Sequence, residues 1–123
     1  MSTTGERFER AVQIMARLRA PGGCPWDREQ TFDTIKPYTL EETYEVLEAI
    51  DNRDWPELTG ELGDLLLQVL FYSQMAREAG HFSIDDVLDR LALPDRRNPD
   101  RAPLASSPNQ STLGGYARAD IAP

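Results

Sequence analysis

The sequence contains one cysteine, one histidine and one lysine, and each scarcity limits what the protein can be. The single cysteine, Cys24, cannot form an internal disulfide, which is typical of the reducing cytoplasm. The single lysine, Lys36, in a chain of net charge −8 argues against a nucleic-acid partner, because phosphate backbones are bound by clustered Lys and Arg. We therefore expect a cytoplasmic protein that does not bind nucleic acid.

Long hydrophobic runs are also scarce. Apolar runs such as residues 65–67 are far too short to cross a bilayer, and the charged first ten residues do not form a secretory signal. With 123 residues, of which 40% are hydrophobic and 28% charged, the composition is that of one globular domain. Helical periodicity is lost where prolines become frequent, so we expect a domain at 1–93 and an irregular or disordered tail at 94–123.

The periodicity of the first 93 residues is helical, and no segment has the alternation of a strand. We expect an all-α bundle of about four helices. Three boundaries follow from capping signals: Thr39 and Asp54 begin helices, and Gly80 ends one. Tyr44 and Leu47 should pack against a leucine stripe that begins at residue 58. The expected elements are a helix at 6–18, a loop at 20–30, a turn at 31–35 ended by Pro37, and helices at 39–51, 55–79 and 83–93.

Two acidic clusters lie on the second and third long helices, Glu41-Glu42-x-x-Glu45 and Glu61-x-x-Asp64. Residues three or four apart share a helix face, so each cluster places like charges side by side. Unpaired charges are costly to bury, whereas all-oxygen ligands suit a hard cation such as Mg²⁺. A solvated helix face with a capping box is the ordinary alternative for the first cluster.

Two other metal sites do not fit these clusters. A di-iron carboxylate bundle needs Glu-x-x-His motifs, and the only histidine, His81, lies outside both clusters. A calcium loop would need an Asp-rich segment of about twelve residues with a central glycine, which the sequence lacks.

Four motifs give the sequence a family resemblance: Gly-Gly-Cys-Pro-Trp-Asp at 22–27, Gln-Thr-Phe at 30–32, Pro-Tyr-Thr-Leu-Glu-Glu-Thr-Tyr-Glu at 37–45 and Gly-Glu-Leu-Gly-Asp-Leu-Leu at 60–66. They resemble the MazG family of nucleoside triphosphate pyrophosphohydrolases from about Phe8 to Leu91. The resemblance implies an all-α enzyme that works as a homodimer or higher homo-oligomer. It also implies Mg²⁺-dependent hydrolysis of nucleoside triphosphates, either canonical ones or non-canonical and damaged ones, to monophosphate and pyrophosphate.

The same resemblance implies roles for individual residues. Glu41 would complete the site or orient the attacking water, and Mn²⁺ would be able to replace Mg²⁺. Trp26 either stacks on a base or anchors its loop, and Lys36 either contacts phosphate or is exposed to solvent. The family's basic ending is lost after Leu91, where only Arg96 and Arg97 offer substitute phosphate contacts. The implied metal ligands are Glu42, Glu45, Glu61 and Asp64.

Two functional hypotheses follow. The first is a nucleoside triphosphate pyrophosphohydrolase. The second is a non-catalytic MazG-like module that binds metal, nucleotide or another helical protein, and the altered ending supports it. In either case the apolar face of the long helix at 55–79 is wider than one short neighbour can cover, which predicts a homodimer.

Overall fold

A computed structural model describes residues 1–92 of the chain, and all of its regular structure there is α-helical. This confirms the predicted fold class. The chain divides into two units, residues 1–83 and 84–123, which we describe separately. The predicted tail lies outside the described residues, and the boundary at 93/94 stays a prediction. The helices are α1 (Thr4–Arg19), α2 (Pro25–Glu29), α3 (Phe32–Asp51), α4 (Trp55–Ala79) and α5 (Ile84–Ala92).

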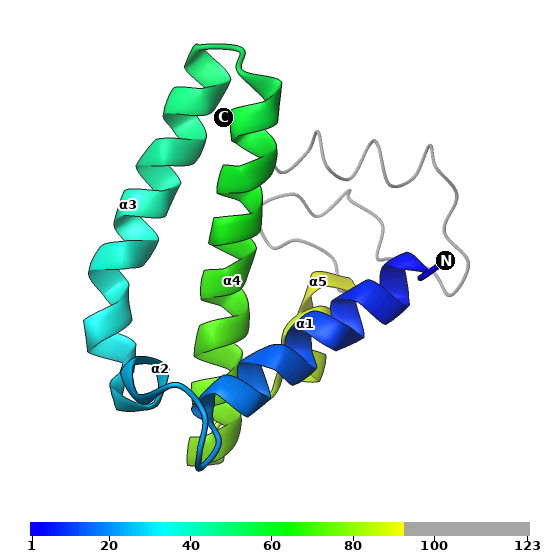
Figure 1. Ribbon diagram of the computed structural model, residues 1–123, viewed down its shortest axis with the longest axis vertical. Helices are drawn as coiled ribbons and strands as arrows, with labels where there is room; N and C mark the ends of the chain where they lie inside the picture. The colour runs from blue at the N-terminus through cyan, green and yellow to red at the C-terminus, as the bar shows by residue number, and fades with distance from the viewer. Residues whose placement is uncertain (93–123) are drawn as a thin grey trace. The chain divides into compact units, whose positions relative to one another are not determined.

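Helices α3 and α4 form an antiparallel hairpin, which is the main body of the first unit (Figure 1). The carboxylate of Asp54 accepts a hydrogen bond from the Glu57 N–H at 3.2 Å and caps the start of α4. Gly80 ends the helix in the left-handed conformation, with φ of 77°. These local signals explain why the bounds predicted for this helix, 55–79, are confirmed.

The predicted break at Pro37 and the predicted helix start at Thr39 are both wrong. Helix α3 begins after Thr31, whose side chain forms a capping box with Thr34, and it continues through Pro37. Proline removes one backbone hydrogen bond there, but the preceding turn buries Ile35, which is only 1% exposed. Burial of this side chain in the core offsets the missing bond. The Thr39 hydroxyl lies inside the helix and bonds to the side chains of Gln68 and Tyr72 at 3.1 and 2.6 Å.

The segment at 20–30, predicted to be a loop, contains the short helix α2, which begins with Pro25 at its first position. A tight turn precedes it. The Cys24 N–H donates to the Leu18 carbonyl at 2.9 Å, and a Cβ on Gly23 would overlap the Arg17 and Leu18 carbonyl oxygens. The turn therefore requires glycine at position 23.

The apolar core lies where α1 crosses the hairpin, and it consists of Met15, Ile35, Phe71 and Met75. The predicted packing of Tyr44 and Leu47 against the leucine stripe of α4 is wrong. Tyr44, Leu47 and Leu62 are about half exposed or more. Helix α3 instead buries Val46 and Ala49, and α4 buries the polar side chains Glu61, Gln68 and Ser73.

The second unit contributes α5 to the described part of the chain. Asp85 and Asp86 lie in its first turn and Arg90 in its last, an arrangement that matches the polarity of the helix dipole. Among residues 1–92, none of the helices combines the length and the apolar character needed to span a membrane.

Candidate metal centre

The hairpin brings three carboxylates together near its closed end. Glu42 and Glu45 are three residues apart on α3, and Glu61 lies on α4. One oxygen from each carboxylate lies within 4.8 Å of the other two. Residues from both predicted acidic clusters therefore meet across the pair of helices.

The cluster is partly withdrawn from water. Glu61 is only 9% exposed, and Glu42 and Glu45 are half-buried. Within residues 1–92, the Oε2 atoms of Glu42 and Glu61 are buried and accept no hydrogen bond from an N–H or hydroxyl donor. A buried polar oxygen without a partner is costly, so these two atoms are the strongest local sign of a missing ligand.

Crowding of the carboxylates changes their ionisation. The pKa of Glu61 is raised to about 8, first by a hydrogen bond with Glu45, then by burial and by hydrogen bonds with Glu57 and Glu42. Burial also raises the pKa of Glu42, and the charges of Glu45, Asp64 and Glu41 raise it further. Without a cation, the chain relieves the repulsion by holding a proton on the cluster.

The donor set fits a hard divalent cation. All three groups offer carboxylate oxygens, and among residues 1–92 no N–H or hydroxyl donates to the buried Oε2 atoms of Glu42 and Glu61. Such a cation would replace the shared proton and neutralise the repulsion directly. Mg²⁺ prefers oxygen ligands and keeps several waters, which agrees with three carboxylates at the edge of an open cleft.

The other two predicted acidic site residues lie beside this group rather than in it. Asp64 is exposed one turn further along α4 than Glu61, and Glu41 is exposed next to Glu42. Both charges act on Glu42, because each raises its pKa. Asp64 is therefore close enough to influence the cluster, although it is not one of the three residues whose oxygens converge.

A cleft of about 340 Å³ opens beside the cluster, towards the turn between α3 and α4. Sequence reasoning assigned Glu57 only a capping role, but its hydrogen bond to Glu61 makes it part of the same acidic environment. The spacing of four residues between Glu57 and Glu61 was the available signal. The cleft is lined by Glu45, Glu48, Ala49, Asn52, Asp54, Glu57 and Glu61.

The residues predicted to contact the substrate lie in different parts of the chain, and not all of them are described by the structure. Trp26 is about half exposed. Lys36 is exposed and lies 3.8 Å from Asp33. It is nine residues from Glu45 on the same helix, which puts the two about 180° apart around the axis. Lys36 therefore points away from the acidic cluster of its own chain. Arg96 and Arg97 lie outside the described residues.

Comparison with known protein families identifies the family of the chain that contains this acidic cluster. The model of the MazG nucleotide pyrophosphohydrolase domain matches residues 30–101, more than half of the chain. The chain belongs to the MazG family. The match contains every carboxylate of the cluster and of its cleft, so the acidic cluster lies inside the MazG domain.

Relatives of this chain support the same assignment. The chain is 54% identical over 112 residues to a nucleoside triphosphate pyrophosphohydrolase of Escherichia coli, covering 87% of this chain and 41% of that protein. It is 52% identical over 91 residues to the nucleoside triphosphate pyrophosphohydrolase/pyrophosphatase MazG of Thermotoga maritima, covering 74% and 36%. The Mycobacterium tuberculosis pyrophosphohydrolase is 48% identical over 104 residues, covering 83% and 30%. The chain thus spans less than half the length of these relatives.

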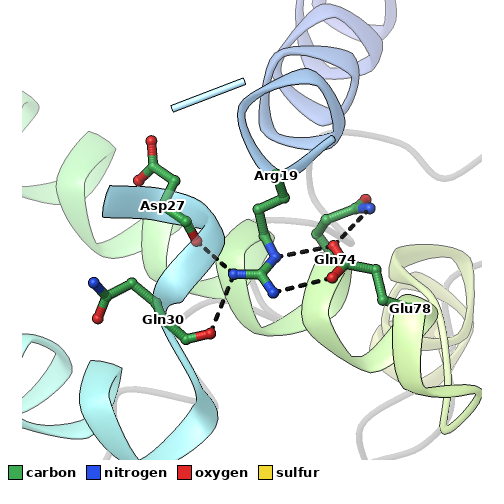
Figure 2. A network of polar contacts seen from close by, with 5 residues as sticks. All are labelled: Arg19, Asp27, Gln30, Gln74 and Glu78. Atoms are coloured by element: carbon green, nitrogen blue, oxygen red, sulfur yellow. Dashed lines mark hydrogen bonds and ion pairs between the residues drawn. The ribbon is translucent and has the colours of Figure 1, made fainter. Parts of the chain in front are cut away.

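A second polar network in the first unit of the chain was not predicted from the sequence (Figure 2). Arg19, near the end of α1, forms two hydrogen bonds to the Glu78 carboxylate, at 2.9 and 3.0 Å. It also donates to the backbone carbonyls of Asp27 and Gln30, and its guanidinium lies 5.7 Å from the centre of the Phe71 ring. One side chain thus joins α1, α2 and α4.

Proposed function

We propose that this MazG domain hydrolyses nucleoside triphosphates, including non-canonical or damaged ones, to nucleoside monophosphate and pyrophosphate in a Mg²⁺-dependent reaction. The observation that carries the proposal is the convergence of Glu42, Glu45 and Glu61, two of which have a buried oxygen that receives no hydrogen bond from an N–H or hydroxyl of residues 1–92. The names of the relatives support the reaction, and the single cysteine is consistent with a cytoplasmic setting.

Electrostatics explain why such a site needs a cation. A triphosphate would be repelled by five neighbouring carboxylates unless positive charge lay between them. In the proposal, Glu42, Glu45, Glu61 and Asp64 hold Mg²⁺ or Mn²⁺. When bound, the ion would neutralise the phosphates, polarise the α-phosphoryl group and acidify a water molecule.

Glu41 is the proposed base, because its side chain is exposed beside Glu42 and it is not one of the proposed metal ligands. It would orient the attacking water and accept its proton while oxygen attacks the α-phosphorus. The bond between the α-phosphorus and the α,β-bridging oxygen breaks, and pyrophosphate leaves. Most of the rate enhancement would come from positioning and electrostatic stabilisation.

The test is a panel of nucleoside triphosphates with Mg²⁺, followed by measurement of released pyrophosphate. We expect release from at least one of them, with loss of activity in Glu42→Gln and in Glu61→Gln. No release from any member of the panel would refute the proposal. Calorimetry that detects nucleotide binding in the same protein would then favour the non-catalytic binding module.

We also propose that the domain forms a homodimer through the side of the hairpin opposite the acidic cluster. Five large apolar side chains are exposed on this apolar face: Leu40, Leu47, Leu62, Leu66 and Val69. An apolar patch of this kind, rimmed by polar residues, is typical of an interaction site. Light scattering that gives the mass of a monomer at micromolar concentration would contradict the dimer.

A further inference from the structure

Hydrogen bonds between side chains join α3 to α4 at a level between the apolar core and the acidic cluster. The Thr39 hydroxyl of α3 lies 3.1 Å from Oε1 of Gln68 and 2.6 Å from the hydroxyl of Tyr72, both on α4. We call Thr39, Gln68 and Tyr72 the polar bridge. Gln68 is only 9% exposed, and the other two residues are half-buried. Because the bridge is largely shielded from water, loss of one hydroxyl would leave its buried partner unpaired, which is costly.

The hydroxyl of Tyr72 is the fixed point of the polar bridge. A threonine hydroxyl has one hydrogen, and that of Thr39 donates to Gln68, so Tyr72 is the donor to Thr39 Oγ1. The Tyr72 ring is stacked on Phe32, with centroids 6.1 Å apart and planes 4° apart, and it packs against the apolar core. These contacts hold the hydroxyl in place, so the bridge ties α3 to a rigid part of α4.

Helix geometry places the polar bridge next to the acidic cluster, on the facing sides of α3 and α4 (Figure 1). Thr39 precedes Glu42 by three residues, which puts both on one face of α3. Gln68 follows Glu61 by seven residues, two turns along the same face of α4. Because the helices are antiparallel, both steps lead in the same direction along the hairpin. The bridge therefore lies roughly 5 to 10 Å from the cluster along the helix axes.

The spacing of α3 and α4 at the cluster decides which cation fits between them. Repulsion between the carboxylates pushes the two helices apart, whereas the polar bridge holds them together nearby. Mg²⁺ demands near-ideal octahedral geometry with ligands at about 2.0–2.1 Å, while Ca²⁺ accepts variable geometry at about 2.3–2.6 Å. A small increase in the spacing of the helices therefore penalises Mg²⁺ more than Ca²⁺.

We propose that the polar bridge positions the carboxylates of α3 and α4 for Mg²⁺, so that Thr39, Gln68 and Tyr72 set the preference of the cluster for Mg²⁺ over Ca²⁺. The inference rests on the proposed function in one respect, because it takes the acidic cluster as the site of the metal. The bridge residues are positioning residues, since they act through the helices that carry the ligands. Groups that orient metal ligands in this way typically contribute about 10- to 100-fold to metal affinity.

Thr43 provides a matched control on the same helix. Its hydroxyl donates to the Thr39 carbonyl at 2.8 Å, one turn back on α3, and the Thr39 hydroxyl lies in the same way 3.3 Å from the Ile35 carbonyl. Thr43 is exposed, and within residues 1–92 its side chain forms no hydrogen bond to α4. Thr43→Val thus removes a bond inside α3, whereas Thr39→Val also removes the bridge to α4.

The experiment measures binding of Mg²⁺ alone and of Ca²⁺ alone by calorimetry at one fixed pH. We expect Thr39→Val, Gln68→Met and Tyr72→Phe to bind Mg²⁺ about tenfold more weakly than the parent. The change for Ca²⁺ should be smaller, because its coordination is more flexible, so the ratio of the two affinities falls several-fold. Thr39→Ser keeps the hydroxyl and should retain the Mg²⁺ affinity of the parent, and Thr43→Val should bind both ions like the parent.

The ratio of the two affinities separates positioning from a merely structural role. Urea unfolding should show some loss of stability in every bridge variant, because a buried hydrogen bond is removed. A merely structural role would lower stability and leave the ratio of Mg²⁺ to Ca²⁺ affinity at the value of the parent. Circular dichroism checks that each variant is folded. If Thr39→Val does not fold, Tyr72→Phe decides the test, since it removes one hydroxyl and keeps the stacked ring.

The outcomes distinguish this inference from the proposed function. If the parent releases pyrophosphate but folded bridge variants keep its ratio of affinities, or Thr43→Val shifts the ratio equally, the positioning role is refuted and the proposed function stands. If the ratio falls as expected but the parent releases no pyrophosphate, the positioning role is supported and the proposed function is refuted. A parent that binds neither ion overturns the metal site and this inference together.

Discussion

Replacement of Glu61 by glutamine should remove most of the pH dependence of stability that the acidic cluster gives to the metal-free protein. The folded-state pKa of Glu61 is raised to about 8 from an ordinary value of 4.5. Between these two values the unfolded chain is ionised while the folded chain keeps its proton. Folding near pH 6 should therefore take up about one proton at this site.

The sign follows from this uptake. Because the folded state binds more protons, the free energy of unfolding should fall as pH rises from about 5 to 8. The raised pKa of Glu42 acts in the same direction. The lowered pKa values of Glu6 and Glu78 have the opposite effect, with stability lost as pH falls below about 4.5, outside this window.

The assay is urea unfolding with a chelator at four pH values between 5 and 8, at constant protein concentration and ionic strength. The parent should lose stability as pH rises, and Glu61→Gln should show a much flatter profile. Addition of Mg²⁺ should stabilise the parent more at pH 8 than at pH 5, because the cation replaces the proton. Equal slopes for parent and variant, or a parent that becomes more stable towards pH 8, would refute the reasoning.

Three further predictions concern packing. Leu62→Glu should convert the proposed dimer to a monomer with little loss of helicity, and light scattering that still gives a dimer would exclude this face as the interface. Ile35→Ala should cost about 2–5 kcal/mol in urea unfolding because its side chain is fully buried, and a loss below about 1 kcal/mol would contradict the core described above. Gly23→Ala should destabilise the domain, since its Cβ would overlap two carbonyl oxygens, whereas Gly60→Ala has open space and should stabilise α4 by up to about 1 kcal/mol in thermal unfolding. The reverse order of these two glycine variants would contradict the turn geometry.

Where the sequence predicted helix boundaries well, the signals were local. The cap at Asp54 and the left-handed glycine at position 80 act within a few residues, and they fix α4 independently of its partners. The break expected at Pro37 failed because burial of Ile35 depends on contacts with α1 and α4. A local rule for proline cannot include that tertiary contribution.

The acidic cluster was foreseeable because each helix carries its carboxylates at short spacing, and the pairing of α3 with α4 needed only their antiparallel arrangement. The sequence did not indicate which face of α3 or of α4 is buried. Hydrophobic periodicity identified Leu47 and Leu62 as core, yet both are exposed and Glu61 faces the partner helix instead. Periodicity reports which side chains avoid water, but it does not report whether a helix of the same chain or another molecule covers them.

The remaining residues of interest were hidden because their contacts join distant parts of the chain. Arg19 and Glu78 are 59 positions apart, and Trp26 meets Tyr38 and Phe71 from a helix of only five residues. Neither contact leaves a periodic pattern in the sequence. Charge and aromatic composition alone could not indicate which of these side chains would meet.

The central claim, that the acidic cluster directs water to the α-phosphorus of a nucleoside triphosphate, is tested most directly by hydrolysis in ¹⁸O-labelled water with Mg²⁺. Mass spectrometry then locates the label in the products. The account predicts nucleoside monophosphate that carries the ¹⁸O, unlabelled pyrophosphate, and no turnover by Glu42→Gln. Label in the pyrophosphate, release of orthophosphate, or full activity of Glu42→Gln would contradict it.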